Sequence, residues 1–330
     1  MSKTLSPNKL HGLFLVWKKY QRRPEVLADL TDCELQFIPH LFRSKYLRPL
    51  DYLLKLFVSI KNILSQRPDF VIAQCPPTYS ALPALITRTP YVIDGHNPLF
   101  QVKMWQTLPL ARTLIENATA IIVHNAEMFQ MVNKNYPDAQ LFTISDPIKP
   151  ITAAVAQRQP KQILVIASFD PWDEPVELLI ETMTELAEYQ FVITADVSKL
   201  DSATAEKLKK LDNVVLTGFL STEKYHQTLC SSLAALVLTT SNATQPSGAC
   251  EALSADTQLV ISKTSLTAKL FGEWAVLVDN SSTSIAQAIR SLCVKQLNLA
   301  NYRQEWNAAV EQEIEQLQKY LQQQTNKTYD

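Results

Sequence analysis

Short runs of valine, isoleucine and leucine alternate with amphipathic stretches along almost the whole of this 330-residue chain. Runs of this composition are typical of strands that are buried on both faces, and the stretches between them have the apolar spacing of helices. Strands that are regularly separated by helices form parallel sheets with helices on both faces. The alternation therefore predicts an α/β protein.

The same pattern predicts where the individual elements lie. The strands expected in the first half are residues 13–17, 35–38, 70–73, 91–94, 120–123 and 141–144. The strands expected in the second half are residues 163–167, 191–194, 214–217, 235–238, 259–261 and 275–278. The helices expected between and after them are residues 50–64, 80–86, 105–115, 126–133, 176–187, 203–211, 222–229, 248–255, 284–294 and 302–323.

The segment 146–161 carries three prolines and little periodic pattern, which is typical of a linker. At about 150 residues per domain, the length also indicates two domains. We expect a first domain at residues 1–147 and a second at 148–330, with the last helix able to pack back on the first. Two doubly wound, Rossmann-like domains that face a cleft bind ligands at the carboxyl ends of their strands.

Glycine is scarce, since the chain has only five and no two of them are close in sequence. A phosphate loop, a dinucleotide fingerprint and a G-x-S-x-G nucleophile elbow each need closely spaced glycines, so all three are excluded.

The two halves of the chain differ in charge. Residues 1–150 carry 17 basic and 11 acidic side chains, whereas residues 151–330 carry 14 basic and 21 acidic ones. This asymmetry favours different partners for the two halves, or their mutual attraction across a cleft.

The five cysteines are scattered and include no C-x-x-C pair, which excludes a zinc ribbon and indicates a reducing compartment. No cleavage-like site follows the short apolar run near the N-terminus. No stretch approaches the roughly 18 apolar residues of a membrane span. We therefore expect a cytoplasmic protein.

The segment 239–262 combines a strand end, a polar loop and a helix that Gly248 opens. A helix N-terminus presents free backbone N–H groups and a partial positive charge, which suit a phosphate. Glu251, one turn into the helix, is placed to accept hydrogen bonds from a ribose diol. The alternative is that Ser247 caps the helix while Glu251 merely offsets the helix dipole.

The sequence QPSGACEALSADTQLVIS at residues 245–262 resembles the donor-binding motif of the GT-B fold glycosyltransferases, in particular those of family 4. In that family the glutamate binds the ribose of a nucleotide-sugar, and the preceding backbone amides hold its diphosphate. The resemblance therefore implies Glu251 for the ribose, and Gly248, Ala249 and Cys250 for the phosphates.

Other segments agree with this family in order and spacing. Residues 163–183 resemble the first strand and helix of its donor domain, and residues 214–229 resemble the strand, turn and helix that contact the base. The residues thereby implied to contact the base are Thr217, Gly218 and Leu220. In the first half, residues 91–100 and 120–128 resemble strand ends that face the cleft.

The chain departs from the family at two points. Many members have an arginine and a lysine after the first strand of the donor domain, both of which reach the diphosphate, whereas Ser168 and Glu174 stand near those positions here. The earlier acid of the Glu-x7-Glu motif would fall at Ala243, with Gln245 nearby as a polar substitute. We interpret the chain as a member of a subfamily that neutralises the diphosphate in another way.

Polar residues follow the fourth expected strand. Asp94, His96 and Asn97 stand at its carboxyl end, and His96 is a candidate to position the sugar or to act as a base. The alternative is that Asp94 and Asn97 merely build a turn. His124, at the next strand end, is a weaker candidate. Because the chain has no Asp-x-Asp motif and no His/Cys cluster with zinc spacing, we expect no metal site.

The segment 43–67 is basic and apolar together, with its apolar residues at helical spacing. One interpretation is an amphipathic core helix with a solvated basic rim, and the other is a surface that binds anionic lipid headgroups. Arg22 and Arg23 follow the first strand, where the phosphate of an acceptor would also fit. The bases expected to bind the acceptor or the membrane are Arg22, Arg23, Arg43, Lys45, Arg48 and Lys55.

Together these observations predict a metal-independent, hexosyltransferase-like enzyme that needs no cofactor and uses a nucleotide-diphosphate sugar as co-substrate. The expected acceptor is a hydroxyl of a lipid-linked glycan or polysaccharide intermediate on the inner face of a membrane, and nucleic acid is not an expected partner. Retention of anomeric configuration is implied by the resemblance alone. The alternatives are a non-catalytic binding or scaffold subunit of the same fold and a nucleotide-sugar epimerase.

Overall fold

The computed structural model describes residues 10–42, 44–154, 157–169, 173–295 and 297–329. The chain divides into two compact units. The first comprises Met1–Pro147 together with Ala308–Asp330, and the second comprises Ile148–Asn307. The last helix thus contributes its C-terminal part to the first unit.

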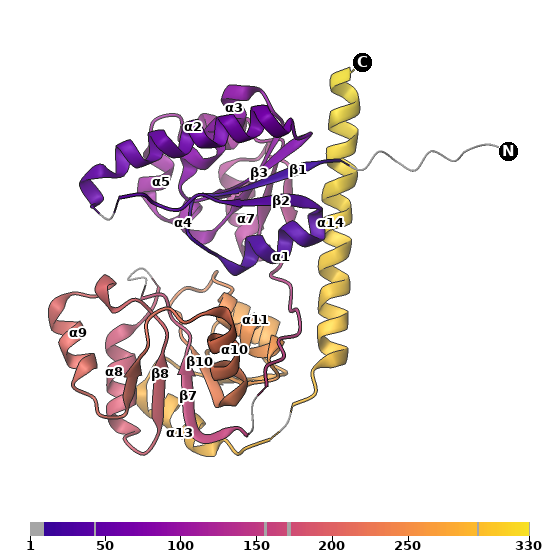
Figure 1. Cartoon of the computed structure of the whole chain (residues 1–330). Coiled ribbons are helices and arrows are strands. Elements are labelled where there is room, and N and C mark those ends of the chain that lie inside the picture. The colour runs from indigo at the N-terminus through magenta and orange to yellow at the C-terminus, as the bar shows by residue number, and fades with distance from the viewer. Residues whose placement is uncertain (1–9, 43, 155–156, 170–172, 296, 330) are drawn as a thin grey trace. The chain divides into compact units, whose positions relative to one another are not determined.

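The first unit is built on a parallel sheet of six strands (Figure 1). They are β1 (Gly12–Val16), β2 (Cys33–Phe37), β3 (Phe70–Cys75), β4 (Tyr91–Gly95), β5 (Ala120–Val123) and β6 (Leu141–Thr143). They lie in the order β2-β1-β3-β4-β5-β6, and every neighbouring pair is parallel. Strands on the two sides of the β1/β3 pair are wound in opposite directions, so this pair is the topological switch point of the sheet.

Helices cover both faces of this first sheet. The connecting helices are α1 (Arg22–Thr31), α2 (Arg48–Gln66), α3 (Leu82–Thr87), α4 (Asn97–Gln101), α5 (Lys103–Thr107), α6 (Ala111–Glu116) and α7 (Ala126–Asn135), with short turns η1 (Lys45–Leu47) and η2 (Thr78–Ala81). Leu13 and Leu15 of β1 enter a core shared with α2, α3, α6 and α7. On the opposite face lie α1 and the last helix, α14 (Ala300–Tyr329), whose Ile314, Leu317 and Leu321 are buried (Figure 1).

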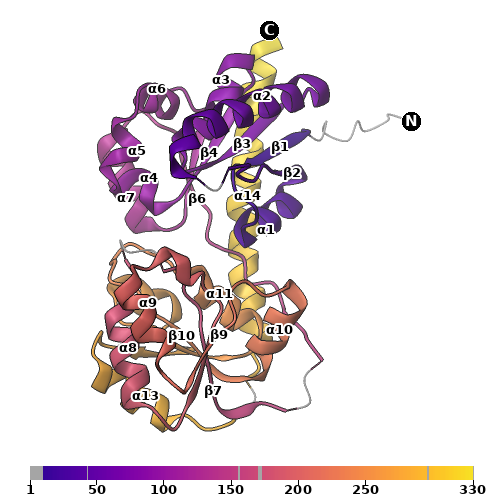
Figure 2. The same ribbon diagram turned by 60° about the vertical axis from the view of Figure 1, so that its left-hand side comes forward.

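The second unit contains another parallel sheet of six strands (Figure 2). They are β7 (Gln159–Val165), β8 (Gln190–Ile193), β9 (Val214–Leu216), β10 (Ser232–Val237), β11 (Gln258–Ser262) and β12 (Ala275–Val278). Their order is β12-β11-β10-β7-β8-β9, with the switch point between β7 and β10. The helices are α8 (Val176–Glu185), α9 (Ser202–Lys209), α10 (Thr222–Ser231), α11 (Ser247–Ser254), α12 (Ser265–Phe271) and α13 (Ser282–Ser291), with a short turn η3 (Val197–Lys199).

Alternate residues of this second sheet enter two separate cores. Ile163 and Val165 of β7 pack with α8 and α13 on one face, whereas Leu164 packs with α11 on the other. In Figure 2, α8, α9 and α13 accordingly lie on one side of the sheet, and α10 and α11 lie on the other. Burial on both faces explains why these strands are continuous apolar runs in the sequence.

The two sheets confirm the predicted α/β class and its two Rossmann-like domains. All twelve expected strands form within a few residues of the predicted ranges. Helices α1, α4 and α12 were not predicted. With five residues in α4 and seven in α12, these two are too short to display an apolar period.

Three other expectations need correction. The predicted helix at 105–115 is two helices, α5 and α6, because Leu110 between them has a left-handed φ of 63°. The predicted linker at 146–161 is too long, since β7 begins at Gln159. The last helix is longer than the predicted range 302–323, because α14 runs from Ala300 to Tyr329.

Candidate functional site

The carboxyl ends of β7 and β10 meet at the switch point of the second sheet, where a doubly wound fold binds its ligand. Asp173, in the loop after β7, joins the two ends. Its Oδ2 accepts a hydrogen bond from the Thr239 hydroxyl at 3.1 Å, and its carbonyl accepts one from the Thr240 amide at 2.7 Å. We did not predict this buried acid, and the only signal in the sequence was its place shortly after a strand.

Gly248 lies in the first turn of α11, which follows β10. A Cβ at this position would lie 2.8 Å from Cγ2 of Ile166 and 3.4 Å from Cγ2 of Val237. The glycine therefore allows α11 to pack closely on the ends of β7 and β10. Ile166 thus occupies the space that a side chain at position 248 would need.

The N-terminus of α11 presents fewer free amides than predicted. Its N-cap is Pro246 and no side chain caps it, so the alternative in which Ser247 caps the helix is wrong. The Ala249 amide donates to the Pro246 carbonyl at 3.0 Å. Phosphate binding by the amides of Gly248, Ala249 and Cys250 stays a prediction, and for Ala249 it requires this bond to open.

Glu251 is half-buried and accepts a hydrogen bond from the Tyr225 hydroxyl of α10. It is the fifth residue of α11, beyond the first turn in which a carboxylate best compensates the helix dipole. The contact holds the carboxylate in one orientation. Ribose binding by Glu251 stays a prediction, and its partner Tyr225 was not predicted.

Gln245 is buried beside Cys250, with its Nε2 3.6 Å from the Cys250 Sγ. Its Oε1 has no hydrogen-bond partner among the residues that the structure describes. Because buried polar atoms are normally hydrogen-bonded, this oxygen is available to a donor group of a ligand. The suggestion that Gln245 substitutes for the earlier acid stays a prediction.

The Glu174 carboxylate binds the N–H groups of the loop after β7. It accepts hydrogen bonds from the Phe169 amide at 2.7 Å, the Ser168 hydroxyl at 2.8 Å and the Ser168 amide at 2.9 Å. Phe169 has a left-handed φ of 55°, so the two successive amides face one anion, as in the backbone concavities called nests. Ser168 and Glu174 therefore bind each other, and a diphosphate could contact this loop only if the carboxylate leaves it.

The turn after β9 holds the residues predicted to contact the base. The Thr217 hydroxyl lies 2.9 Å from the Gly218 carbonyl and 3.2 Å from the Ile193 carbonyl, so it is engaged by backbone. Gly218 has φ of 61°, a conformation that glycine adopts without strain. Leu220 is half-buried, while Phe219, which we did not predict, is 82% exposed. Base binding at this turn stays a prediction.

In the first unit, Arg23 joins three segments at the carboxyl edge of the sheet. Its Nε lies 3.2 Å from Asp94 Oδ1, its Nη1 pairs with Asp146, and its Nη2 donates to the Ile144 carbonyl at 2.8 Å. Burial opposes ionisation of Asp94, but Arg23 and the neighbouring histidines more than offset it and lower the pKa of Asp94. Arg23 is thus a buried structural cation, which corrects its assignment to an acceptor phosphate.

His96 and His124 complete this cluster. Their rings meet edge to face, with centroids 4.5 Å apart, and His96 Nε2 lies 3.3 Å from Asp94 Oδ2. Burial lowers the pKa of both histidines, so both rings are neutral at pH 7. Asp94 is fully buried, whereas the His96 side chain is 15% exposed.

Of the three residues predicted to be catalytic, only His96 is therefore accessible to a ligand. It stands just before α4 in extended conformation, and Asn97, buried, is the first residue of that helix. Asp94 cannot touch a substrate, and its assignment is corrected to that of a positioning residue that orients His96. The catalytic role of His96 stays a prediction.

Helix α2 packs Tyr52, Leu56 and Ile63 against the core of the first unit and exposes other apolar residues. Its buried positions include Asp51, Lys55 and Ser59, which lie one turn apart along a single face. The large apolar side chains exposed on it are Leu50, Leu53, Phe57, Val58 and Leu64, between 44% and 65% exposed. We call these five residues the α2 apolar stripe. Its exposure is opposite to the interpretation of α2 as an amphipathic core helix with a basic rim.

Polar contacts hold the inner face of α2. Lys55 Nζ donates to the Trp17 carbonyl at 3.0 Å and lies 3.8 Å from Asp51 Oδ2, while the Trp17 indole donates to the Ser59 hydroxyl at 3.0 Å. Asp51 also binds His40. These bonds satisfy a buried polar face, which leaves the apolar face to solvent.

The predicted membrane- and acceptor-binding bases differ in their surroundings. Lys55 is 1% exposed, which corrects its assignment to an outer surface. Arg22 and Arg48 are half-buried, and Arg43 lies outside the described residues. Lys45 lies in η1. Among the helices that the structure describes, none has the length and apolarity needed to cross a membrane.

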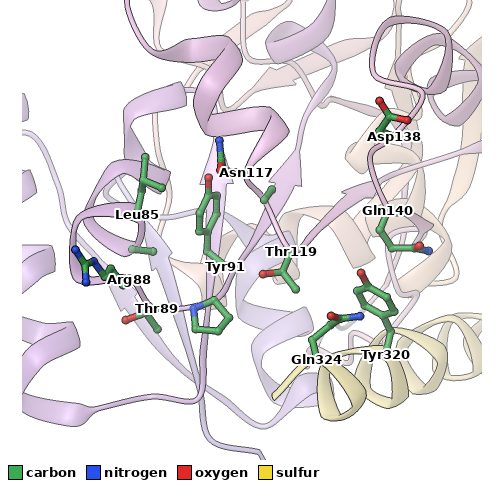
Figure 3. Close-up of a pocket in the computed structure, with 13 residues that line it drawn as sticks. Leu85, Arg88, Thr89, Tyr91, Asn117, Thr119, Asp138, Gln140, Tyr320 and Gln324 are labelled. Carbon is green, nitrogen blue, oxygen red and sulfur yellow. The ribbon is translucent and has the colours of Figure 1, made fainter. Parts of the chain in front are cut away.

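The structure also has a hollow of about 520 Å³ in the first unit (Figure 3). Tyr91, Thr119 and Gln140, at the amino ends of β4, β5 and β6, line it together with Tyr320 and Gln324 of α14. Ligands of doubly wound folds bind at the carboxyl ends of strands. Because the hollow lies at the opposite edge and includes none of the predicted site residues, we do not assign the active site to it.

Comparison with known proteins finds a family resemblance within the second unit. Residues 160–294 match the family model described as "Glycosyl transferases group 1". This range contains the switch point, the turn after β9 and α11 with Glu251. A search of curated protein sequences found no match.

Solved structures similar to the chain share little sequence with it. Sucrose-phosphate synthase from Thermosynechococcus elongatus is 12% identical to this chain, with a TM-score of 0.65. The match covers 97% of this chain and 98% of the synthase chain. Anabaena HepE in complex with UDP and glucose is 15% identical over 97% of this chain and 99% of its own, with a TM-score of 0.58. A UDP-N-acetylglucosamine 2-epimerase from Listeria monocytogenes, described as putative, is 12% identical over 85% and 87%, with a TM-score of 0.54. The second unit is therefore similar to the group 1 glycosyl transferase family over residues 160–294, and the chain as a whole has the GT-B fold of these solved structures.

Proposed function

We propose that the chain transfers a sugar from a nucleotide-diphosphate sugar to an acceptor hydroxyl at an anionic membrane surface. The donor binds the second unit, and the acceptor binds the first. The observation that carries the proposal is the group 1 family match, because it covers the whole predicted donor site. Retention of anomeric configuration, as the resemblance implies, is part of the proposal.

The donor diphosphate binds backbone amides in place of the missing arginine and lysine. The amides of Ser168 and Phe169 already hold a carboxylate, that of Glu174, and a concavity that holds one anion suits another. The N-terminus of α11 lies beside this loop, since Ile166 contacts Gly248. Together they stabilise the leaving diphosphate without a side-chain cation.

The nucleoside binds further along the same edge. Glu251, oriented by Tyr225, accepts the ribose hydroxyls, and the exposed ring of Phe219 stacks on the base. UDP is the nucleotide to test first, because HepE has been solved with UDP and with UDP-glucose. In the first unit, His96 contacts the acceptor, and the rate derives from positioning.

The acceptor is lipid-linked, and the α2 apolar stripe docks on the membrane that holds it. Exposed bases flank the stripe at Lys61 and Arg67, and the only acid of segment 43–67, Asp51, is fully buried. Each base near an anionic surface contributes about 1 kcal/mol, and the inserted apolar side chains add to it. A helix that exposes both basic charge and apolar area is more favourably placed at an anionic bilayer surface than in water.

The epimerase alternative has support from the fold alone, since epimerases are among the similar structures. It gives no reason for the α2 apolar stripe. A non-catalytic scaffold subunit is the other alternative, and the missing arginine and lysine are its support. Nucleotide binding and product analysis together separate the transferase, the epimerase and the scaffold subunit.

The decisive experiment measures thermal unfolding of the full chain with UDP, GDP and ADP. A nucleotide at 100 times its dissociation constant stabilises the native state by about 2.7 kcal/mol. We expect stabilisation by one of them, lost in Glu251→Ala and kept in the matched control Glu223→Ala, an exposed acid on α10. Absence of any stabilisation, or equal stabilisation in Glu251→Ala, contradicts the donor site.

Product analysis with the corresponding nucleotide-sugar then separates the functions. A transferase releases the nucleoside diphosphate in proportion to added lipid-linked acceptor, an epimerase changes the sugar without an acceptor, and a scaffold does neither.

The proposed membrane binding is tested by flotation with anionic and neutral vesicles. We expect binding to anionic vesicles only, lost in the double variant Leu53→Gln, Phe57→Gln and kept in Val294→Gln, a residue exposed by 51% in the second unit.

A further inference from the structure

The buried cluster at the carboxyl edge of the first sheet has the composition of a metal site. Asp94, His96 and His124 each place one ligand atom so that all three lie within 4.8 Å of one another. They come from the ends of two adjacent strands, β4 and β5, so the sheet itself fixes their spacing. We propose that these three side chains bind a divalent transition-metal ion of the Zn²⁺ class.

The distances between the ligand atoms fit such an ion. A tetrahedral ion with bonds of about 2.0–2.1 Å holds its ligand atoms roughly 3.3 Å apart. His96 Nε2 and Asp94 Oδ2 are 3.3 Å apart, and His124 Nε2 is 4.0 Å from Asp94 Oδ1. The three ligand atoms all lie within 4.8 Å of one another, so His124 Nε2 would have to move closer to the other two when an ion binds.

Two of the three ligand atoms accept no hydrogen bond from the described residues. Asp94 Oδ2 and His124 Nε2 are buried and have no hydrogen-bond partner among the described residues. The Gln74 amide nitrogen lies 2.8 Å from His96 Nε2 and 2.6 Å from the Gln21 amide oxygen. In the tautomer in which Gln74 donates this bond, His96 Nε2 is the acceptor and carries a lone pair. An ion would take the place of the Gln74 donor.

The charge of the surroundings also favours a cation. Arg23 donates to Asp94 Oδ1 and not to Oδ2, so Arg23 does not compete for the oxygen that faces His96. Asp94 and Asp146 carry two negative charges against the single positive charge of Arg23. A divalent ion in this cluster would add positive charge beside these two carboxylates.

Two imidazole nitrogens and one carboxylate oxygen suit zinc, cobalt, iron and manganese more than calcium or magnesium. Three protein ligands leave at least one position open for water or for an oxygen of a ligand. His96 is the most exposed of the three and supplies the path for entry. The site does not depend on the proposed donor site, which lies in the other unit, and it is an alternative to the expectation from the sequence that no metal binds.

The test is calorimetric titration of the chelator-treated full chain with ZnCl₂ in the absence of nucleotide. We expect one Zn²⁺ per chain, with affinity reduced by at least about 100-fold in His124→Ala, since even the loss of an outer partner of a ligand reduces affinity 10–100-fold. His226→Ala, a histidine of the second unit, is the matched control and should bind like the unmodified chain. Cobalt spectra separate this site from the free cysteines, because thiolate ligands add charge-transfer absorption that nitrogen and oxygen ligands lack.

His96→Ala gives a second reading if His124→Ala does not fold, because His96 lies at the exposed end of the cluster. Circular dichroism of the metal-free variants establishes that each is folded. The proposal is overturned if the unmodified chain binds neither Zn²⁺ nor Co²⁺, if both histidine variants bind as tightly as the control, or if cobalt spectra show thiolate ligation. Failure of the nucleotide experiment leaves these outcomes unchanged, so the two proposals can fail separately.

Discussion

The carboxyl edges of the two sheets are filled by different chemical groups. At the edge of the first sheet, buried side chains of opposite charge neutralise one another, with Arg23 between Asp94 and Asp146. At the edge of the second, the groups are mostly backbone amides and a carboxylate, Glu174, that they hold. A buried ion pair is strongly destabilised by loss of one member, whereas a backbone site tolerates changes of side chain. The comparison indicates a rigid edge in the first sheet and a more adaptable edge in the second.

The largest effect is expected at the first edge. Arg23→Met leaves two buried carboxylates without their partner and should lower the free energy of unfolding by about 3–5 kcal/mol in urea denaturation. Arg112→Met is the matched control, because its pair with Glu116 is exposed and should contribute less than about 1 kcal/mol. Equal effects of the two substitutions would show that burial of the first pair is energetically unimportant.

The first unit should also carry a pH dependence that the donor edge lacks. Burial lowers the pKa of Lys55 to about 8, against about 10.4 in an unfolded chain. Between these values the unfolded state binds more protons, so raising the pH stabilises the native state. From pH 8 to 10 the unmodified chain should gain of the order of 2 kcal/mol relative to Lys55→Met. Parallel stability curves for the two proteins would contradict the burial of a charged lysine.

At the second edge, Gly248→Ala should lower the free energy of unfolding by about 1–3 kcal/mol, as overpacking does. The reason is that the Cβ added by this substitution would lie 2.8 Å from Ile166 Cγ2. In an Ile166→Ala background the same substitution should have a smaller effect, and the difference is the coupling between the two sites. If the effect is undiminished, the close approach to Ile166 is not its cause.

The smallest effect is expected at Tyr225→Phe, which removes the hydrogen bond to Glu251. It should lower the free energy of unfolding by only about 0.5–1.5 kcal/mol, since the half-buried carboxylate can turn to water. Tyr46→Phe, on a side chain 95% exposed, is the control and should have no effect. A loss above about 3 kcal/mol would mean that the second edge is as rigid as the first.

Helix α2 illustrates how far the sequence predicts this molecule. The spacing of Leu50, Leu53 and Phe57 predicted the helix, and the helix forms. The same spacing led to the interpretation that the apolar residues of α2 are buried, which is wrong for the α2 apolar stripe but agrees with the packing of Tyr52, Leu56 and Ile63 against the core. Which face turns inward depends on partners for the polar one, and Trp17, the partner of Lys55 and Ser59, is about forty residues away in the sequence.

Apolar runs and their separations were enough to establish the strands, the α/β class and the two domains, because burial on both faces requires continuous apolar residues wherever a central strand lies. Side-chain partners across the fold were decided by the tertiary structure alone. Arg23 reads as a surface base in the sequence, yet it pairs with residues 71 and 123 positions away. Such pairing follows from which strand ends the sheet order brings together, and no local pattern in the chain encodes that order.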